Sequence, residues 1–421
     1  MITLIDLLIV NISAVLVFIL REVWGHFPNQ PPSYFFGKYG WAIFFLNILY
    51  FFLFWMLGAY DRRQKRALLE EFVMIFGVIS TGLFVLITFL FMGQMWWMSR
   101  GILYMFWALS IISLCVSRII YRSKSASGKI IRSANLEKTR QKLMQKKKAL
   151  VFSNTSLSIV VVTYNSIDKL KKCLNSIKEA DLKMPHTIII VDNNSSDGTA
   201  EYVKNNYPRI KLVKNMENYG YSRAVNIGLK SAPADFYLIS NPDMTLIPGS
   251  IEVVLDHMLQ NPGTGLSSCK LLNTDGSLQY SARRFLDLRT YLYRFTPIRG
   301  LMKGSAIERS YLMQDWDHND NRAVDWVLGG LMLLRKEAYD KVGPLDENIF
   351  LYFEDVDLCF RMWDLGWQID YISEAVVIHE HIRASANKIF NRATYEHIKS
   401  LFYFLRKHGL NLPKNCPSSV E

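Results

Sequence analysis

The sequence predicts an α/β domain preceded by an all-α region of four transmembrane helices, and three observations support this division. Four apolar runs of roughly bilayer-spanning length occupy residues 2–20, 39–60, 72–93 and 101–121. A basic segment follows them, and from residue 157 β-branched strands alternate with helical patterns. The 421-residue chain is 50% hydrophobic, which excludes a disordered protein, and its five widely spaced cysteines exclude a disulfide scaffold.

The net charge of +12 belongs to one segment of the chain. Residues 118–148 carry 11 Lys/Arg and one acid, whereas residues 149–421 carry 31 charges of each sign. A nucleic-acid-binding domain would carry its basic residues on a folded face, so this distribution predicts no nucleic-acid partner. A polybasic segment directly after an apolar run is typical of a juxtamembrane region at an anionic leaflet.

We therefore expect four transmembrane helices over residues 1–121 and a polybasic cytoplasmic linker over 122–155. Lys and Arg concentrate at 61–66 and after 121, which places both termini in the cytoplasm. The Lys-rich stretch 137–150 could be helical, and we expect it to lie on the membrane surface rather than make a specific contact. Asp6 is near enough to the N-terminus to reach the interface, while Asn11 and Asn47 are expected to bridge helices.

The N-terminal region carries a pattern formed by Ser99-Arg100, Trp107 and Ser117-Arg118. With the spacing of the apolar runs, this pattern resembles the four-helix N-terminal region of bacterial polyprenyl-phosphate sugar-phosphotransferases. The catalytic part of those enzymes has no counterpart here. The resemblance implies a protein of the bacterial envelope with lipid-linked sugar chemistry. Together with the apolar runs and the Lys/Arg distribution, we expect a multi-pass protein of the bacterial inner membrane with a cytoplasmic catalytic domain.

Strands and helices alternate through the first part of the soluble half, which predicts a mostly parallel sheet with helices on both faces. We expect strands at 157–163, 187–192, 210–213 and 236–240, and helices at 167–177, 201–206 and 222–231. Asp192 ends the second strand and Asp243 follows the fourth. Ligands of such sheets bind beyond the carboxyl ends of strands, so these acids could bind a nucleotide and a divalent metal. Capping or turn formation is the alternative role of a single strand-end Asp, and no P-loop or dinucleotide motif is present.

Ordered motifs in residues 156–385 resemble glycosyltransferase family 2, and most closely its rhamnosyltransferase-like subgroup. They are Val161-Val162-Thr163-Tyr164-Asn165, Val191-Asp192-Asn193-Asn194-Ser195-Ser196-Asp197-Gly198-Thr199, Asn218-Tyr219-Gly220-Tyr221, Asn241-Pro242-Asp243, Gly329-Gly330, Gly343-Pro344-Leu345-Asp346, Phe353-Glu354-Asp355-Val356-Asp357 and Ile378-His379. The resemblance implies a GT-A fold, a nucleotide-diphosphate sugar donor, a divalent metal and inversion at the anomeric carbon.

The same resemblance implies roles for individual residues. The expected nucleotide-binding residues are Thr163, Tyr164, Asn165, Asp192, Asn194, Asn218 and Gly220. Asp243 is expected to hold Mg²⁺ or Mn²⁺ on the diphosphate, with His379 completing the metal or diphosphate site. The expected acceptor-side residues are Trp326, Gly329, Gly330 and Glu354.

Asp355 is the expected catalytic base, because direct displacement requires deprotonation of the attacking acceptor hydroxyl. Glu354, Asp355 and Asp357 place three acids within four positions, which favours a raised pKa on one of them. The alternative is that these acids stabilise the start of a helix and that Asp357 forms an i,i+4 ion pair with Arg361. For Asp357 we favour this structural role.

The expected enzyme transfers rhamnose or a similar sugar to an undecaprenyl-diphosphate-linked saccharide in cell-envelope polysaccharide synthesis; no oligomeric state is predicted. The chain lacks the Gln-x-x-Arg-Trp motif of processive family 2 synthases, which favours the addition of one or a few sugars. A processive synthase and a catalytically silent scaffold are the alternatives. Residues 386–421 should form a C-terminal amphipathic helix and tail that pack on the domain, with membrane docking as the alternative.

Overall fold

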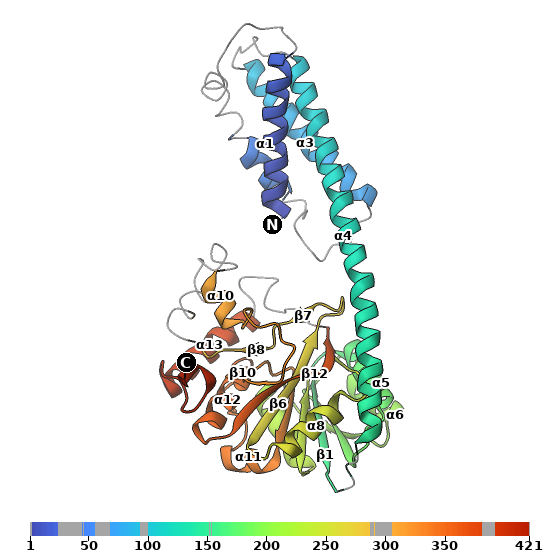
Figure 1. Cartoon of the computed structure of the whole chain (residues 1–421), viewed down its shortest axis with the longest axis vertical. Helices are drawn as coiled ribbons and strands as arrows, with labels where there is room; N and C mark the ends of the chain where they lie inside the picture. The colour runs from blue at the N-terminus through green and yellow to red at the C-terminus, as the bar shows by residue number, and fades with distance from the viewer. Residues whose placement is uncertain are drawn as a thin grey trace. The chain divides into compact units, whose positions relative to one another are not determined.

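A computed structural model describes residues 2–23, 44, 46–54, 68–92, 100–150, 152, 154–286, 290, 305–380 and 392–420. The chain divides into two compact units, Met1–Gly128 and Lys129–Glu421. Figure 1 shows that the first consists of helices and the second of a sheet with helices around it. The predicted division into an all-α region and an α/β domain is thus present.

The first unit contains α1 (Ile2–Val23), α3 (Leu68–Met92) and the first part of α4 (Arg100–Ala149), with a further helical stretch at 46–54. Within the described ranges, one helix is long and apolar enough to cross a bilayer, at Leu69–Ile87. Shorter apolar helices cover Leu8–Val17 and Tyr104–Ile120. Much of the expected span at 39–60 lies outside the described residues, so the four-span region stays a prediction.

Polar side chains link the helices of this unit. The amides of Asn11 and Asn47 exchange hydrogen bonds of 2.8 and 3.0 Å, which confirms that they bridge helices. Asp6 is only 1% exposed and pairs with Arg118 at 2.7 Å. Arg118 thus provides the buried carboxylate with a cationic partner, and the expectation that Asp6 reaches the interface stays a prediction.

Helix α4 continues for 50 residues without a break at position 121. Its C-terminal part belongs to the second unit, where Leu143 is 2% exposed and Leu136 and Leu150 pack against the same core. The Lys147 ammonium lies 2.5 Å from the carbonyl oxygens of Ala180 and Asp181. The expectation that residues 137–150 make no specific contact is thus wrong, because leucines spaced by seven give this helix a buried stripe.

The second unit is built on a mixed sheet of order β3-β2-β1-β4-β11-β6-β12-β5. Its strands are β1 (Leu157–Thr163), β2 (His186–Asp192), β3 (Lys211–Lys214), β4 (Phe236–Ser240), β5 (Met244–Leu246), β6 (Thr264–Leu272), β11 (Leu331–Arg335) and β12 (Gln368–His379), with short β7 (Leu278–Gln279) and β9 (Arg322–Ala323). Two further short strands, β8 (Ala282–Arg283) and β10 (Trp326–Val327), pair in a separate two-stranded sheet. The four predicted strands are confirmed and lie parallel. The expectation of a mostly parallel sheet needs correction. Strand β11 is antiparallel to β4 and β6, and strand β5 is antiparallel to β12.

Helices cover both faces of this sheet (Figure 1). They are α5 (Ile167–Ala180), α6 (Thr199–Asn206), α7 (Tyr221–Ser231), α8 (Ser250–Gln260), α10 (Ala306–Tyr311), α11 (Lys336–Val342), α12 (Glu354–Asp364), α13 (Arg392–His408) and α14 (Pro417–Val420). Alternate residues of β1 enter different cores: Val160 and Val162 pack with α7, whereas Ile159 and Val161 pack with α5 and α8. Burial of both faces explains why this strand is a continuous β-branched apolar run.

Candidate active site

The carboxyl ends of β1 and β2 lie side by side, because Thr163 pairs with Asp192 in the parallel register. Both residues are fully buried. The Oδ2 atom of Asp192 accepts a hydrogen bond from the Ser195 N–H at 3.2 Å, whereas Oδ1 accepts none among the described residues. A buried acceptor without a donor is costly, so Asp192 is suited to receive an N–H group from a ligand.

Hydrogen bonds join the loops after β1 and β2, and in three of them a backbone N–H donates to a side chain. The N–H of Asn165 donates to Ser195 Oγ at 2.9 Å, and the Asn165 side-chain oxygen accepts from the Ser196 N–H at 2.8 Å. The third runs from the Ile167 N–H to Asp197 Oδ2 at 3.0 Å. Tyr164, the first residue after β1, is 48% exposed and offers an aromatic surface. The expected nucleotide residues at 163–165 therefore gather with Asp192, while Asn194 is exposed on the same loop.

Asn193 organises the loop that carries Asn218 and Gly220. Its amide nitrogen donates to Asn218 Oδ1 at 2.9 Å and to the Gly220 carbonyl oxygen at 3.1 Å. Its amide oxygen accepts from the Asn215 side chain and the Tyr219 N–H. The sequence analysis placed Asn194 in the pocket and missed Asn193, because nothing in an Asn-Asn pair shows which side chain points inward.

Gly220 occupies a position that excludes any side chain. Its φ is +84°, and a Cβ atom there would lie 2.7 Å from the Phe350 carbonyl oxygen. The adjacent Tyr221 N–H donates to that same oxygen at 2.7 Å. This close approach fixes the start of α7 against the loop that leads to α12.

Asp243 and His379 meet because β5 and β12 pair antiparallel, which places His379 opposite Met244. His379 Nε2 lies 3.3 Å from Asp243 Oδ1, and the Lys169 ammonium lies 3.2 Å from Asp243 Oδ2. Burial would raise the pKa of Asp243, but His379 and Lys169 outweigh it and hold that pKa below its usual value. The sequence analysis missed Lys169, which reaches the site from the first turn of α5.

Asp355 and Glu354 begin α12 and are 9% and 6% exposed. The Asp355 carboxylate accepts from the N–H groups of Gly329 at 2.8 Å and Val356 at 2.9 Å. Burial raises the pKa of Asp355, although these N–H groups and Arg283 act in the opposite direction. Burial and the Asp355 charge raise the pKa of Glu354 to about 8. The predicted crowding of acids thus raises the pKa of Glu354, whereas burial alone raises that of Asp355.

Gly329 and Gly330 lie between the two acidic groups. A Cβ atom on Gly329 would lie 3.1 Å from Asp355 Cβ, and one on Gly330 would lie 2.3 Å from Met244 Cε and 3.5 Å from His379 Cε1. The Tyr221 hydroxyl donates to the Gly329 carbonyl oxygen at 3.3 Å. Asp355 and the Asp243–His379 pair therefore border the same glycine turn and belong to one site.

Trp326 is 3% exposed and faces the interior of the domain. Its indole N–H donates to the Arg284 carbonyl oxygen at 2.8 Å. The Arg283 guanidinium lies over the Tyr311 ring at 5.3 Å and over the Trp326 ring at 5.8 Å. Trp326 thus supports Arg283, and its expected contact with an acceptor stays a prediction.

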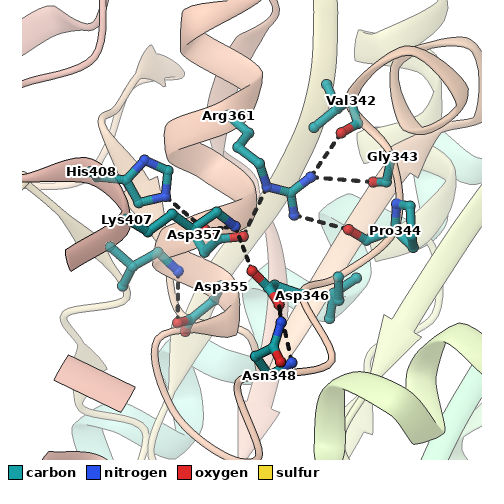
Figure 2. A network of polar contacts seen from close by, with 12 residues as sticks. Val342, Gly343, Pro344, Asp346, Asn348, Asp355, Asp357, Arg361, Lys407 and His408 are labelled. Carbon is teal, nitrogen blue, oxygen red and sulfur yellow. Dashed lines mark hydrogen bonds and ion pairs between the residues drawn. The ribbon is translucent and has the colours of Figure 1, made fainter. Parts of the chain in front are cut away.

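Asp357 is held in an ionic cluster (Figure 2). Its buried carboxylate contacts Arg361 Nε at 2.8 Å, Lys407 Nζ at 2.7 Å and His408 Nε2 at 2.8 Å. Lys407 also pairs with Asp346 at 2.6 Å. The structural role expected for Asp357 is confirmed, and so is the packing of α13 on the domain, where Leu401 and Phe404 are buried. The cluster fixes α12, whose first turn carries Asp355.

The raised pKa of Glu354 predicts a specific dependence of stability on pH. The folded protein keeps this proton up to about pH 8, whereas an unfolded glutamate releases it near its ordinary value of 4.5. Between these values the folded state binds more protons, so the free energy of unfolding falls as pH rises, by up to about 1.4 kcal/mol per pH unit.

Glu354→Gln should remove this contribution and make the variant more stable than wild type at pH 8. Thermal unfolding of the detergent-solubilised protein between pH 5 and 8 measures the effect. Glu337→Gln, at an exposed position of α11, is the matched control. Parallel pH curves for wild type and Glu354→Gln would contradict the assignment.

Comparison with known proteins places the chain among glycosyltransferases. Residues 158–315 match the family described as Glycosyl transferase family 2. An N-acetylglucosaminyl-diphospho-decaprenol L-rhamnosyltransferase of Mycobacterium tuberculosis is 30% identical over 273 residues, which cover 59% of this chain and 83% of the relative. Rhamnosyltransferase WbbL of Escherichia coli is 26% identical over 265 residues, covering 61% of this chain and 95% of the relative.

A solved mannosyltransferase of Pyrobaculum calidifontis, in complex with GDP-Man and Mn²⁺, has a TM-score of 0.41 and 15% identity, covering 69% of this chain and 77% of that chain. The sequence relatives carry the assignment. The M. tuberculosis enzyme is 30% identical and is matched over 83% of its length. The chain belongs to glycosyltransferase family 2 and is a glycosyltransferase.

Proposed function

We propose that the enzyme transfers a sugar, with rhamnose as the first candidate, from a nucleotide-diphosphate donor to a saccharide on a lipid diphosphate. The transfer is a direct displacement with inversion at the anomeric carbon, and one sugar is added to each acceptor. The names of the M. tuberculosis and E. coli relatives support the rhamnosyl group, and the former supports the lipid-diphosphate acceptor. Such a reaction belongs to bacterial cell-envelope polysaccharide synthesis.

The donor nucleotide binds at the carboxyl ends of β1 and β2 in this proposal. The unpaired Oδ1 of Asp192 accepts an N–H group from the base, which is a requirement that a pyrimidine N3–H meets. The exposed ring of Tyr164 covers the base or ribose. Asn218 and Gly220 close over the nucleotide on a loop that Asn193 holds in place.

A divalent cation fits the Asp243–His379 pair. Asp243 Oδ1 is buried, accepts no hydrogen bond among the described residues and lies 3.3 Å from His379 Nε2. No group of three or more His, Cys, Asp or Glu side chains in the described part of the chain could hold a metal alone. A site with two protein ligands suits Mg²⁺ or Mn²⁺, which take further oxygens from substrate phosphates. When bound, the cation offsets charge on the leaving diphosphate.

Asp355 is the base in this proposal. The Gly329 N–H holds one carboxylate oxygen and the Val356 N–H the other, so the carboxylate has a fixed orientation. The acceptor hydroxyl passes its proton to Asp355 as its oxygen attacks the anomeric carbon and the bond to the diphosphate breaks. Burial makes this carboxylate a stronger base than an exposed one. The neutral form of Glu354 can donate a hydrogen bond to the acceptor.

The Gly329–Gly330 turn links the proposed base to the proposed diphosphate site. The Gly329–Gly330 turn has Asp355 against its first residue and Met244 and His379 against its second. The proposed base and the proposed diphosphate site therefore lie beside two adjacent glycines. A direct displacement needs both groups close to one carbon, because the acceptor attacks it as the diphosphate leaves. A Cβ atom at either position would crowd Asp355 or Met244, so the two glycines allow these groups to approach the turn closely.

The enzyme works at the cytoplasmic face of the bacterial inner membrane in this proposal. The apolar segment Leu69–Ile87 supports membrane attachment, and the two shorter apolar helices, Leu8–Val17 and Tyr104–Ile120, fit further spans. An acceptor carried by a polyprenyl chain, such as undecaprenyl diphosphate, lies in that same bilayer. The retained base and metal residues argue against the silent scaffold, and no feature of the described residues favours a processive synthase.

Release of nucleoside diphosphate tests the proposal. Detergent-solubilised enzyme is supplied with UDP-, dTDP- and GDP-sugars, a lipid-diphosphate saccharide pool, and Mn²⁺ or EDTA. Release with one donor that requires both acceptor and metal supports the proposed reaction. Donor binding by calorimetry without release from any pair would instead support the scaffold.

A further inference from the structure

His379 lies between two polar side chains from different parts of the sheet. Its Nδ1 atom is 2.6 Å from Gln279 Oε1, and its Nε2 atom is 3.3 Å from Asp243 Oδ1. Gln279 is in β7, which pairs with β6, whereas His379 ends β12 on the other side of β6. The ring is 5% exposed, so its protein partners determine its orientation.

The hydrogen bonds of the β6–β7 hairpin determine which atom of the Gln279 amide faces the histidine. The Gln279 NH₂ group donates to Asn273 Oδ1 at 3.3 Å. The Asn273 NH₂ group in turn donates to Ser277 Oγ at 2.9 Å, so its oxygen is the atom left to accept from Gln279. Since the Gln279 nitrogen is used in this way, its carbonyl oxygen is the atom directed at His379.

The hairpin that carries Gln279 is itself held by α4. Arg132 Nη1 pairs with Asp275 Oδ2 at 2.9 Å, and Asp275 Oδ1 accepts from the Ser277 N–H at 2.9 Å. Gly276 has φ +74°, and a Cβ atom there would lie 3.0 Å from Arg132 Cβ. The turn therefore fits closely against the helix, which limits movement of Gln279 relative to the sheet.

A carbonyl oxygen can only accept, so the hydrogen bond to Gln279 requires a proton on His379 Nδ1. In neutral imidazole the other nitrogen, Nε2, then carries the lone pair that can bind a metal. We propose that Gln279 is a positioning residue that fixes the Nδ1–H tautomer of His379 and aims Nε2 at the cation held with Asp243. This inference rests on the proposed metal site, and Gln279 itself touches neither metal nor substrate.

Two substitutions of Gln279 separate positioning from general structural support. Gln279→Met keeps the length of the side chain but removes the acceptor, so Mn²⁺ affinity should fall about 10- to 100-fold. Gln279→Glu keeps an acceptor for Nδ1–H, so affinity should stay near wild type or rise. A purely structural role predicts the opposite order, because a charge in this half-buried hairpin is more disruptive than a thioether.

Electron paramagnetic resonance of Mn²⁺ with nucleoside diphosphate and the full-length enzyme measures the dissociation constant without turnover. Electron spin-echo modulation from an imidazole nitrogen reports the His379 ligand directly, and it should be lost in Gln279→Met and kept in Gln279→Glu. Gln260→Met, an exposed position of α8 where the amide contacts Asp256, is the matched control.

A third variant, His379→Ala, distinguishes failure of this inference from failure of the metal site. Weakened Mn²⁺ binding in His379→Ala, with wild-type binding in Gln279→Met, would overturn the role of Gln279 alone. Equal losses in Gln279→Met and Gln279→Glu would also overturn it. Wild-type binding in His379→Ala would overturn the metal site and the positioning role together.

Discussion

Asp355→Asn should lower kcat by about 10²- to 10⁴-fold and leave the affinity for the donor nucleotide unchanged. The substitution keeps the volume of the side chain and one oxygen for the Gly329 N–H, but it removes the group that accepts the proton. Single-turnover rates and calorimetry with the nucleoside diphosphate measure the two effects separately. Asp364→Asn, an exposed acid on the same helix, should retain wild-type turnover.

The pH profile provides a second test of Asp355. The base must be ionised to act, and burial raises its pKa. We therefore expect kcat/KM to fall as the pH decreases. The midpoint of this fall should lie above ~3.9, the ordinary pKa of an aspartate. Near-normal turnover of Asp355→Asn, with an unchanged acid limb, would contradict the assignment of the base.

Asp243→Asn should abolish most metal-dependent turnover. Loss of a cation that supplies several kcal/mol of charge stabilisation corresponds to a decrease in kcat of roughly a thousandfold. The substitution also removes the negative charge that His379 and Lys169 contact, so Mn²⁺ binding should weaken in the same variant. Turnover against Mn²⁺ concentration, together with the Mn²⁺ dissociation constant, measures both effects.

Asp168→Asn is the matched control for Asp243→Asn, since Asp168 lies in the first turn of α5 with a side chain that is 90% exposed. It should leave both turnover and Mn²⁺ affinity at wild-type values. If Asp243→Asn kept Mn²⁺-stimulated turnover, the cation would have to bind elsewhere, and the roles of Asp243 and His379 would be wrong.

The sequence predicted the local parts of the site well. The two central strands β1 and β2 were visible as β-branched runs, and the polar residues after the predicted strands marked the ligand edge. Asp192 and Asp243 were found in this way, whereas Thr163 was named through the family resemblance. The i,i+4 pair of Asp357 with Arg361 was also accessible, because helix geometry alone places them together.

Features that depend on long-range pairing could not be predicted from local patterns. The antiparallel insertion of β11 and the pairing of β5 with β12 bring His379 to Asp243, and no local signal encodes that register. Gln279 looks like an ordinary polar residue until the hairpin places it beside His379. Lys147 belongs to a basic run typical of a membrane surface, yet its ammonium is buried against Ala180 and Asp181.

The helices around the site explain why its geometry can be maintained. Lys407 and His408 of α13 hold Asp357, which lies two residues after Asp355. The C-terminal part of α4 packs on the opposite core through Leu143. The base and the metal pair are thus carried by elements that are fixed on both faces of the sheet, as precise positioning of reacting groups requires.

The most direct measurement is the structure of the glycolipid product formed by the solubilised enzyme. Wild-type enzyme is incubated with the donor identified by nucleotide release and with a lipid-diphosphate saccharide, and the lipid is analysed by mass spectrometry and NMR. We expect an acceptor extended by one sugar, with inverted anomeric configuration, and at least a hundredfold less product with Asp355→Asn. A ladder of long products, retention of configuration, or nucleotide release without a glycolipid would contradict this expectation.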